Sequence, residues 1–164
     1  MSYPVHPTCF DASALVKLYV TEDGSEVLRA YWRTQATRYT TPFCFYETLS
    51  ILKGKWRRGA LTKEAYLGSV SQLVAWFRAS DSLREDLNFI GDRDVFREAR
   101  EIAEHEDLDL SDALQLLTLE AGYFSHFLGG SASLLVTADE PLAAVARKRG
   151  LSVWNCVRDP IAPR

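Results

Sequence analysis

The sequence lacks several features that would place it in a common class of protein. No apolar run reaches the roughly 18 residues that a membrane-spanning helix needs. The first residues contain no basic stretch followed by an apolar one, so we expect no signal peptide. Cysteine is scarce, and the odd number and wide spacing of Cys9, Cys44 and Cys156 predict reduced core residues instead of a disulfide frame or a zinc site. These absences together predict a cytoplasmic protein with no membrane segment.

An excess of positive charge is also absent. The chain has 19 basic and 22 acidic residues, which gives a net charge of −3. Proteins that bind nucleic acid through bulk charge are usually basic. A nucleic-acid ligand would therefore require local basic patches, or metal ions, to offset the repulsion of its phosphates.

Several catalytic motifs are missing as well. The histidines His6, His105 and His126 have no paired metal-ligand spacing, and no His-Glu-x-x-His motif occurs. The glycine-rich loops that cradle nucleotide phosphates and the Gly-x-Ser-x-Gly elbow of serine hydrolases are absent. A phosphatase with Asp11 as nucleophile would have a second acid two residues later, where this chain has Ser13.

What is present is an ordinary globular composition with alternating strands and helices. The 164 residues, of which 47% are hydrophobic and 25% charged, predict a single domain over residues 1–164. Short apolar strands are predicted at 8–10, 39–41, 87–90, 134–137 and 152–154, and helices at 12–19, 25–34, 42–59, 62–79, 92–106, 111–122 and 140–149. This alternation predicts an α/β fold, a three-layer sandwich with a short central parallel sheet covered by helices on both faces.

Four acidic residues are placed where such a fold binds ligands. Asp11 directly follows the first strand, and Asp139 lies two residues after the strand at 134–137. Ligands bind beyond the carboxyl ends of the strands in open α/β sheets. Glu47 and Asp112 lie in apolar helical segments, where a carboxylate is costly unless it is paired, hydrogen-bonded or bound to metal. Dispersed oxygen ligands suit Mg²⁺ or Mn²⁺ better than zinc.

Each of these acids also has a simpler explanation. Asp11 and Asp139 could cap helices through their side-chain oxygens. Asp112 could favour the dipole of its helix from the first turn. Glu47 could face solvent from one side of an amphipathic helix. The four residues together favour a metal site, because two follow strands and two lie in apolar helical segments.

Four sequence segments resemble the acidic motifs of PIN domains, in particular the VapC-type toxin ribonucleases. Phe-Asp-Ala-Ser-Ala-Leu-Val-Lys-Leu-Tyr at 10–19 resembles the opening of these domains, and Tyr-Glu at 46–47 resembles their second acidic position. Leu-Ser-Asp-Ala-Leu-Gln-Leu at 110–116 and Leu-Val-Thr-Ala-Asp-Glu-Pro-Leu at 135–142 resemble the third and fourth. The resemblance extends from residue 8 to about 155. The segment 122–130 is longer than in many members, and Asp109 competes with Asp112 for the third position, for which the Ser-Asp-Ala-Leu pattern favours Asp112.

The resemblance implies an Mg²⁺-dependent endoribonuclease, with Mn²⁺ as a second suitable metal, that acts as the toxin of a type II toxin–antitoxin pair. It assigns the metal to Asp11, Glu47, Asp112 and Asp139. Ser13 and Thr137 could hydrogen-bond a ligand carboxylate or a metal-bound water, or could serve as capping hydroxyls. The alternative function is a catalytically silent module that binds RNA or another protein.

A basic cluster shortly after Glu47 is a candidate substrate contact. Lys53, Lys55, Arg57 and Arg58 surround Trp56. Basic side chains next to an aromatic ring suit single-stranded RNA, through phosphate contact and base stacking. The same charges could instead form a solvated helix end that favours the helix dipole.

Two partners are expected besides RNA. A homodimer is implied by the resemblance, and exposed aromatic residues at an interface would support it, with Tyr31, Trp32, Trp76 and Phe77 as the candidates. The resemblance also implies an antitoxin. An Arg on a tail of that partner would suit a pocket of carboxylates, because a guanidinium can hold a carboxylate by two hydrogen bonds.

Overall fold

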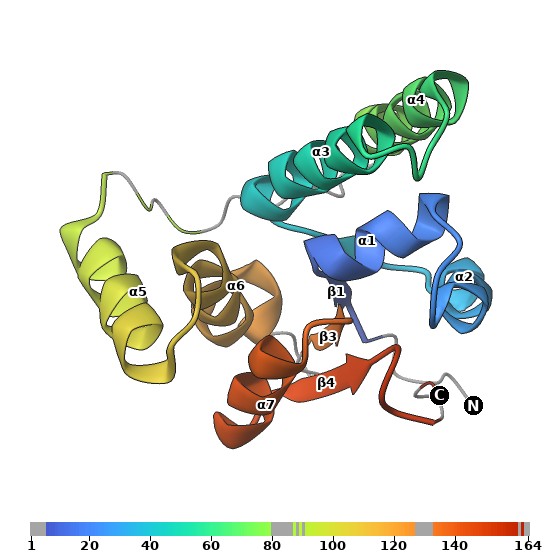
Figure 1. The fold of residues 1–164 in the computed structure, drawn as a ribbon. Coiled ribbons are helices and arrows are strands. Elements are labelled where there is room, and N and C mark those ends of the chain that lie inside the picture. The colour runs from blue at the N-terminus through green and yellow to red at the C-terminus, as the bar shows by residue number, and fades with distance from the viewer. Residues whose placement is uncertain are drawn as a thin grey trace.

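Four short strands form a parallel sheet at the centre of the molecule (Figure 1). The computed structural model describes residues 6–79, 87, 89, 91–126, 133–160 and 162. The strands are β1 (Thr8–Phe10), β2 (Arg38–Tyr39), β3 (Leu134–Thr137) and β4 (Ser152–Asn155), in the order β2-β1-β3-β4. Phe10 pairs with Val136, and Val136 pairs with Trp154. The predicted α/β fold with a parallel sheet is confirmed.

Several of the helices begin where the sequence supplies a capping side chain. They are α1 (Ala12–Tyr19), α2 (Ser25–Thr34), α3 (Pro42–Arg57), α4 (Lys63–Ala79), α5 (Arg93–Glu106), α6 (Leu110–Ala121) and α7 (Glu140–Lys148), with a 3₁₀ turn η1 (Tyr123–His126). The side chains of Asp11, Thr41, Asp92 and Asp139 accept hydrogen bonds from the first turns of α1, α3, α5 and α7. Within the described ranges, no helix is both long and apolar enough to cross a membrane.

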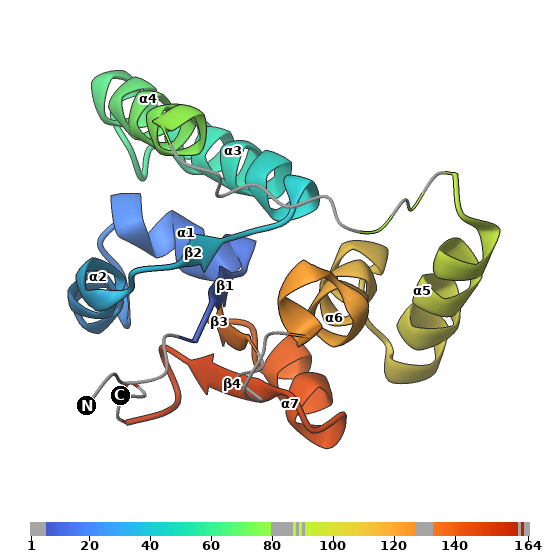
Figure 2. The ribbon, with the colours of Figure 1, turned by 180° about the vertical axis from the view of Figure 1, so that it is seen from behind.

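Side chains that alternate along the strands build two cores, one on each face of the sheet. Cys9, Tyr39 and Leu135 point to the face covered by α5, α6 and α7. Phe10 and Val136 point to the opposite face, which α1 and α2 cover (Figure 2). This two-residue alternation is the pleat of a β-strand, and burial of both faces explains why the strands are apolar throughout.

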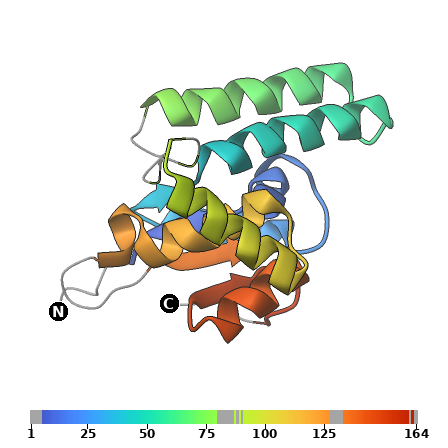
Figure 3. The same cartoon turned by 90° about the vertical axis from the view of Figure 1, so that its left-hand side faces the viewer.

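The α3 and α4 helices form a hairpin that lies over α1. Figure 3 shows the two helices side by side above the rest of the fold. Val16 and Val20 of α1 pack against Leu52 of α3 in a third, smaller core. This contact fixes α3 against the segment that follows β1, and therefore places Glu47 relative to Asp11.

Some predicted boundaries were wrong. The N-cap of α6 lies two residues earlier than predicted, because Asp109 and not Ser111 occupies this position. Leu87 and Phe89 do not belong to a strand, since the Phe89 N–H donates to the Leu87 carbonyl at 2.9 Å in a tight turn. The other two residues of that predicted strand, 88 and 90, lie outside the described residues.

The aromatic residues expected at a dimer interface also contact aromatic rings within this chain. Tyr31 is 8% exposed and its ring centroid lies 4.8 Å from that of Trp154. Trp32 and Trp76 are half-buried, with centroids 4.6 Å apart, and Phe77 lies 4.3 Å from Trp76. Tyr31 is buried, whereas Trp32, Trp76 and Phe77 remain partly exposed, so their place at a dimer interface stays a prediction.

Candidate functional site

Asp11 lies at the carboxyl end of the central strand β1 and is 3% exposed. Its backbone N–H donates to the Val136 carbonyl at 3.0 Å, which extends the pairing of β1 and β3 by one residue. Its Oδ2 accepts from the Ser13 backbone N–H at 3.2 Å and so caps α1. The side chain is therefore fixed at the junction of two central strands and one helix.

Two hydroxyl groups hold the same oxygen of Asp11. Ser13 Oγ donates to Oδ2 at 2.5 Å, and Thr137 Oγ1 donates to it at 3.0 Å. Both hydroxyls accept a hydrogen bond in turn: Ser13 Oγ from the Ala138 N–H at 2.8 Å, and Thr137 Oγ1 from the Asp139 N–H at 2.9 Å. The two hydroxyls therefore connect the ends of β1 and β3 through the Asp11 carboxylate.

The other three predicted acids lie on separate elements. Asp139 is half-buried at the N-cap of α7, where its Oδ1 accepts from the Leu142 N–H at 2.9 Å. Glu47 is exposed in the second turn of α3, and Asp112 is half-buried in the first turn of α6. The expected capping roles of Asp11 and Asp139 are thus real, and they coexist with a place beside the other carboxylates.

These carboxylates are close enough to perturb one another. Burial, followed by the negative charges of Asp11, Asp139, Glu47 and Asp109, raises the pKa of Asp112 to about 7. Burial and the charges of Asp11, Asp109 and Asp139 also raise the pKa of Glu47. Burial raises the pKa of Asp11 too, although the hydrogen bonds from Ser13 and Thr137 oppose this effect. The neighbouring charges that raise the pKa of Asp112 are all carboxylates, so these acids repel one another.

Asp109 and Asp112 occupy different positions at the start of α6. Asp109 is the exposed N-cap residue, and its side chain makes no capping hydrogen bond. Asp112 is half-buried, and the neighbouring acids raise its pKa. The structure therefore places Asp112 inside the group and Asp109 at its rim.

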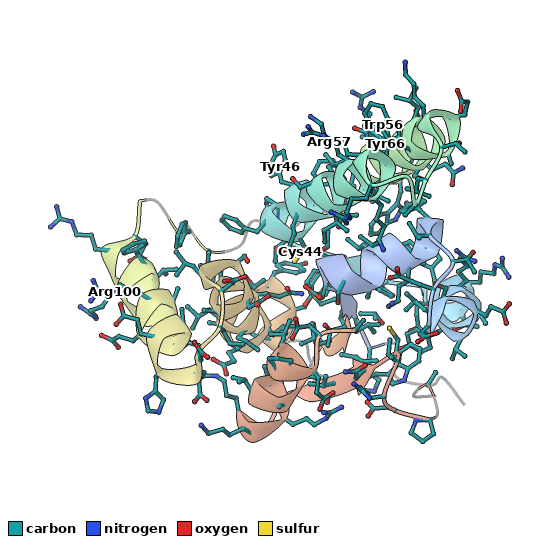
Figure 4. The ribbon with its side chains drawn as sticks, in the orientation of Figure 1. Cys44, Tyr46, Trp56, Arg57, Tyr66 and Arg100 are labelled. Atoms are coloured by element: carbon teal, nitrogen blue, oxygen red, sulfur yellow. The ribbon has the colours of Figure 1, made fainter. Side chains whose placement is uncertain are left out.

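A buried polar contact beneath the acids was not predicted from the sequence. Cys44 Sγ lies 2.9 Å from Gln115 Oε1 and 3.8 Å from Asp11 Oδ1, and both Cys44 and Gln115 are fully buried. Figure 4 shows Cys44 on the side of α3 that faces α1. Cys44 precedes Glu47 by three residues, and Gln115 follows Asp112 by three, so each lies one helical turn from an acid. That spacing was the available signal.

The donor set suits a hard divalent cation in its chemistry. Carboxylate oxygens are the ligands that Mg²⁺ and Mn²⁺ prefer, and a bound cation would offset the repulsion that raises the pKa of Asp112. Across the described residues, no group of three or more His, Cys, Asp or Glu side chains is arranged to hold a metal ion. Binding an ion would therefore require these carboxylates to converge further.

Some residues of the basic cluster of α3 are exposed to solvent, and others already contact side chains of this chain. Lys53, Arg57 and Arg58 are exposed. Lys55 instead donates to Glu22 at 2.7 Å, so its charge is already compensated. The Trp56 ring stacks on that of Tyr66 with centroids 5.0 Å apart and an interplanar angle of 8°, which occupies one of its faces.

Comparison with known proteins identifies the family of this chain. The sequence profile of the PIN domain matches residues 8–148. The chain belongs to the PIN domain family. PIN domains are in general nucleases, and PIN nucleases typically use divalent metals. The matched range includes all four predicted acids.

A solved structure shares the PIN fold. The chain is similar to a crystal structure of PAE2754 from Pyrobaculum aerophilum, with a TM-score of 0.60 and 19% sequence identity over 91% of this chain and 84% of that one. No curated protein matches the sequence. At 19% identity, the similarity extends to the fold alone, and the chemistry of the site depends on this chain's own residues.

Proposed function

We propose that this PIN domain is a metal-dependent endoribonuclease that hydrolyses phosphodiester bonds of RNA. One observation supports this most strongly: carboxylates from four separate elements lie near the carboxyl ends of β1 and β3, where the neighbouring acids raise the pKa of Asp112. Such a cluster repels RNA by itself, and a divalent cation would reverse that repulsion.

The metal would be held by Asp11, Glu47, Asp112 and Asp139, with Mg²⁺ as the first candidate and Mn²⁺ as the second. When bound, such an ion lowers the pKa of a coordinated water and stabilises negative charge on phosphate oxygens. No protein side chain then has to act as the nucleophile.

Ser13 and Thr137 orient the buried carboxylate of Asp11. Each uses its hydroxyl hydrogen on Asp11 Oδ2 and accepts from a backbone N–H, so neither can rotate without losing two hydrogen bonds. Groups that hold a ligand carboxylate in this way commonly change metal affinity or activity when they are mutated. Lys53, Arg57 and Arg58 would contact RNA phosphates along α3.

We further propose that the enzyme is the toxin of a type II toxin–antitoxin pair, that it acts as a homodimer and that it works in the cytoplasm. The partner would insert an Arg from a flexible tail over the carboxylates and exclude Mg²⁺, since a guanidinium neutralises a carboxylate through two hydrogen bonds. A titration of the partner peptide, with this Arg and with Ala in its place, tests this idea. Unchanged affinity and inhibition would contradict it.

A nuclease assay tests the proposed activity. Purified protein is incubated with single-stranded RNA in Mg²⁺, in Mn²⁺ and in EDTA. We expect internal cleavage with either metal and none in EDTA, because the carboxylates cannot act without a cation. Sequencing the RNA ends would then identify the cleaved positions. Cleavage that persists in EDTA would exclude the proposed mechanism.

One observation favours a second candidate, a catalytically silent module that binds RNA or another protein. The carboxylates in the described part of the chain do not converge into a metal-binding group. A silent module would bind the same RNA without cleaving it in either metal, so the same assay combined with a binding measurement separates the two functions.

A further inference from the structure

Gly54 lies inside α3 on the same side of the helix as the acidic residue Glu47. Seven residues separate the two, which is close to two helical turns, or about 10 Å along the axis. Glycine is unfavourable inside a helix compared with alanine. Gly54 does not have a positive φ, so its backbone conformation does not require glycine. A reason for glycine at this position must lie in the space around it.

The side chain of Arg58 fills that space. A Cβ added to Gly54 would lie 3.1 Å from Arg58 Nη1 and 3.6 Å from both Cζ and Nη2. The whole guanidinium therefore lies over the helix backbone at Gly54. The backbone N–H of Arg58 also donates to the Gly54 carbonyl, at 3.1 Å. Arg58 folds back by one turn, which brings its charge nearer to Glu47.

The neighbouring cation Arg57 has a different orientation. Arg57 points away from α1, as does Tyr46, and Figure 4 shows both on the outer side of the helix. Eleven residues, close to three turns, separate Glu47 from Arg58, so these two share one side. Among the described residues, Arg58 makes no ion pair, and it is exposed to solvent. Arg58 is thus an available cation on the same side of α3 as Glu47.

We infer that the guanidinium of Arg58, which lies over Gly54, binds a phosphate of single-stranded RNA about two helical turns along α3 from Glu47. This inference rests on the proposed ribonuclease function and adds a substrate-positioning residue to it. The guanidinium offers two parallel N–H donors to a phosphate, and its charge offsets the repulsion between the strand and the carboxylates. Gly54 keeps the position open that the guanidinium needs.

The test measures binding of a fluorescein-labelled single-stranded RNA of mixed sequence to Asp11→Asn protein over a series of salt concentrations. Replacing Arg58 with Ala is expected to weaken binding about tenfold. It should also lower the slope of log Kd against log salt by about 0.7, the value for one phosphate contact on a single strand. Arg58→Lys should keep the slope, because the charge remains. Arg100→Ala, which removes an exposed Arg on α5, should change neither quantity.

Substitutions at Gly54 test whether the position of the Arg58 guanidinium matters for RNA binding in addition to its charge. Gly54→Ala and Gly54→Leu should weaken RNA binding in increasing order without lowering the melting temperature. Gly68→Leu is the matched control, because Gly68 is also helical and a Cβ there meets nothing within 4 Å. In an Arg58→Ala background, Gly54→Leu should have no additional effect.

The inference would be overturned if Arg58→Ala left the slope of log Kd against log salt unchanged. It would also be overturned if Gly54→Leu weakened RNA binding equally in the presence and absence of Arg58. Its failure can be distinguished from failure of the proposed function. Unmodified protein that cleaves the RNA while these variants bind like the parent contradicts the role of Arg58 alone. Unmodified protein that binds the RNA but never cleaves it contradicts the ribonuclease, and the slope still decides whether Arg58 contacts a phosphate.

Discussion

Asp11 and Asp139 each combine a capping role with a place in the carboxylate group. Asp11 Oδ2 caps α1 and also accepts from the Ser13 and Thr137 hydroxyls. Asp139 Oδ1 caps α7, and its second oxygen is not needed for the cap. Capping and ligand roles are therefore compatible, because a cap fixes the position of a carboxylate and uses only part of its acceptor capacity.

Thr137→Val tests the hydroxyl contacts of Asp11. The variant keeps the side-chain shape but removes the donor to Asp11 and the acceptor for the Asp139 N–H. We expect a loss of about 1–3 kcal/mol in the free energy of unfolding. RNA cleavage should fall by about 10- to 100-fold. Urea unfolding and cleavage rates measure the two effects.

Thr118→Val is the matched control for this substitution. Thr118 is also a buried threonine, but its hydroxyl donates to the Leu114 carbonyl within α6, away from the acids. This variant should cleave RNA at the parent rate. Equal loss of cleavage in both variants would mean that the effect of Thr137→Val is one of general stability.

The pKa of Asp112 predicts a pH-dependent stability in the absence of metal. Burial and the neighbouring acids raise this pKa from 3.8 to about 7. Between these values the folded protein retains a proton that the unfolded chain has released, so the free energy of unfolding should decrease as the pH rises through this window. Below 3.8 both states are protonated, and above about 7 neither is, so this group adds no further change.

Urea unfolding in EDTA over this pH range measures the effect, with Asp112→Asn as the comparison. The variant should show a smaller decline, because Asn does not ionise. Addition of Mg²⁺ should also reduce the decline in the parent, since a cation favours the ionised carboxylate. The same pH dependence in parent and variant would contradict the assignment of this proton to Asp112.

At the level of whole elements, an ion-pair network fixes α3 to the segment that follows α1. Glu22 accepts from Lys17 at 2.8 Å and from Lys55 at 2.7 Å. Burial alone would raise the pKa of Glu22, but the hydrogen bonds from the two lysines outweigh it and hold this pKa below its usual value. Lys55 therefore contributes to the position of α3, and through it to the position of Glu47.

Glu22→Gln should destabilise the protein by about 1–3 kcal/mol, because it leaves the Lys17 ammonium buried without a counter-charge. The exposed pair of Arg100 and Glu104 provides the control, since Glu104→Gln should change the free energy of unfolding by less than about 0.5 kcal/mol. Urea unfolding measures both. Equal and small effects would show that the network contributes little.

The sequence pattern predicted most elements because their signals are local. The caps at Asp11 and Asp139 and the continuous apolar runs of the strands each depend on residues within a few positions of one another. The partners of Lys55 and Trp56 could not be predicted in this way, since Glu22 lies 33 residues before Lys55 and Tyr66 belongs to the next helix. The order of the four acids was evident from the sequence, whereas their mutual effect on pKa depends on how α3 and α6 pack against the sheet.

At the level of the whole molecule, charge is unevenly distributed. The net charge is −3, and five acidic residues act on one another around the ends of β1 and β3. A divalent cation that binds this group binds only the folded state, because the unfolded chain disperses the carboxylates. Binding should therefore stabilise the fold by mass action.

Mg²⁺ or Mn²⁺ at about ten times its dissociation constant should add about 1.4 kcal/mol to the free energy of unfolding. This corresponds to a rise of about 3–6 °C in the melting temperature of a chain of this size. A thermal scan with and without metal measures the rise, and Asp11→Asn should abolish it. An equal rise in that variant would mean that the metal binds elsewhere.

The central claim is that Asp11, Glu47, Asp112 and Asp139 act together in metal-dependent cleavage of RNA. The most direct test is the cleavage rate of Asp112→Asn and Asp11→Asn on single-stranded RNA in Mg²⁺, with circular dichroism as a check that both variants are folded. Asn keeps the size of the side chain and one acceptor oxygen, so the fold should persist, while loss of the negative charge should abolish cleavage. A folded variant that cleaves RNA at close to the parent rate would contradict the claim.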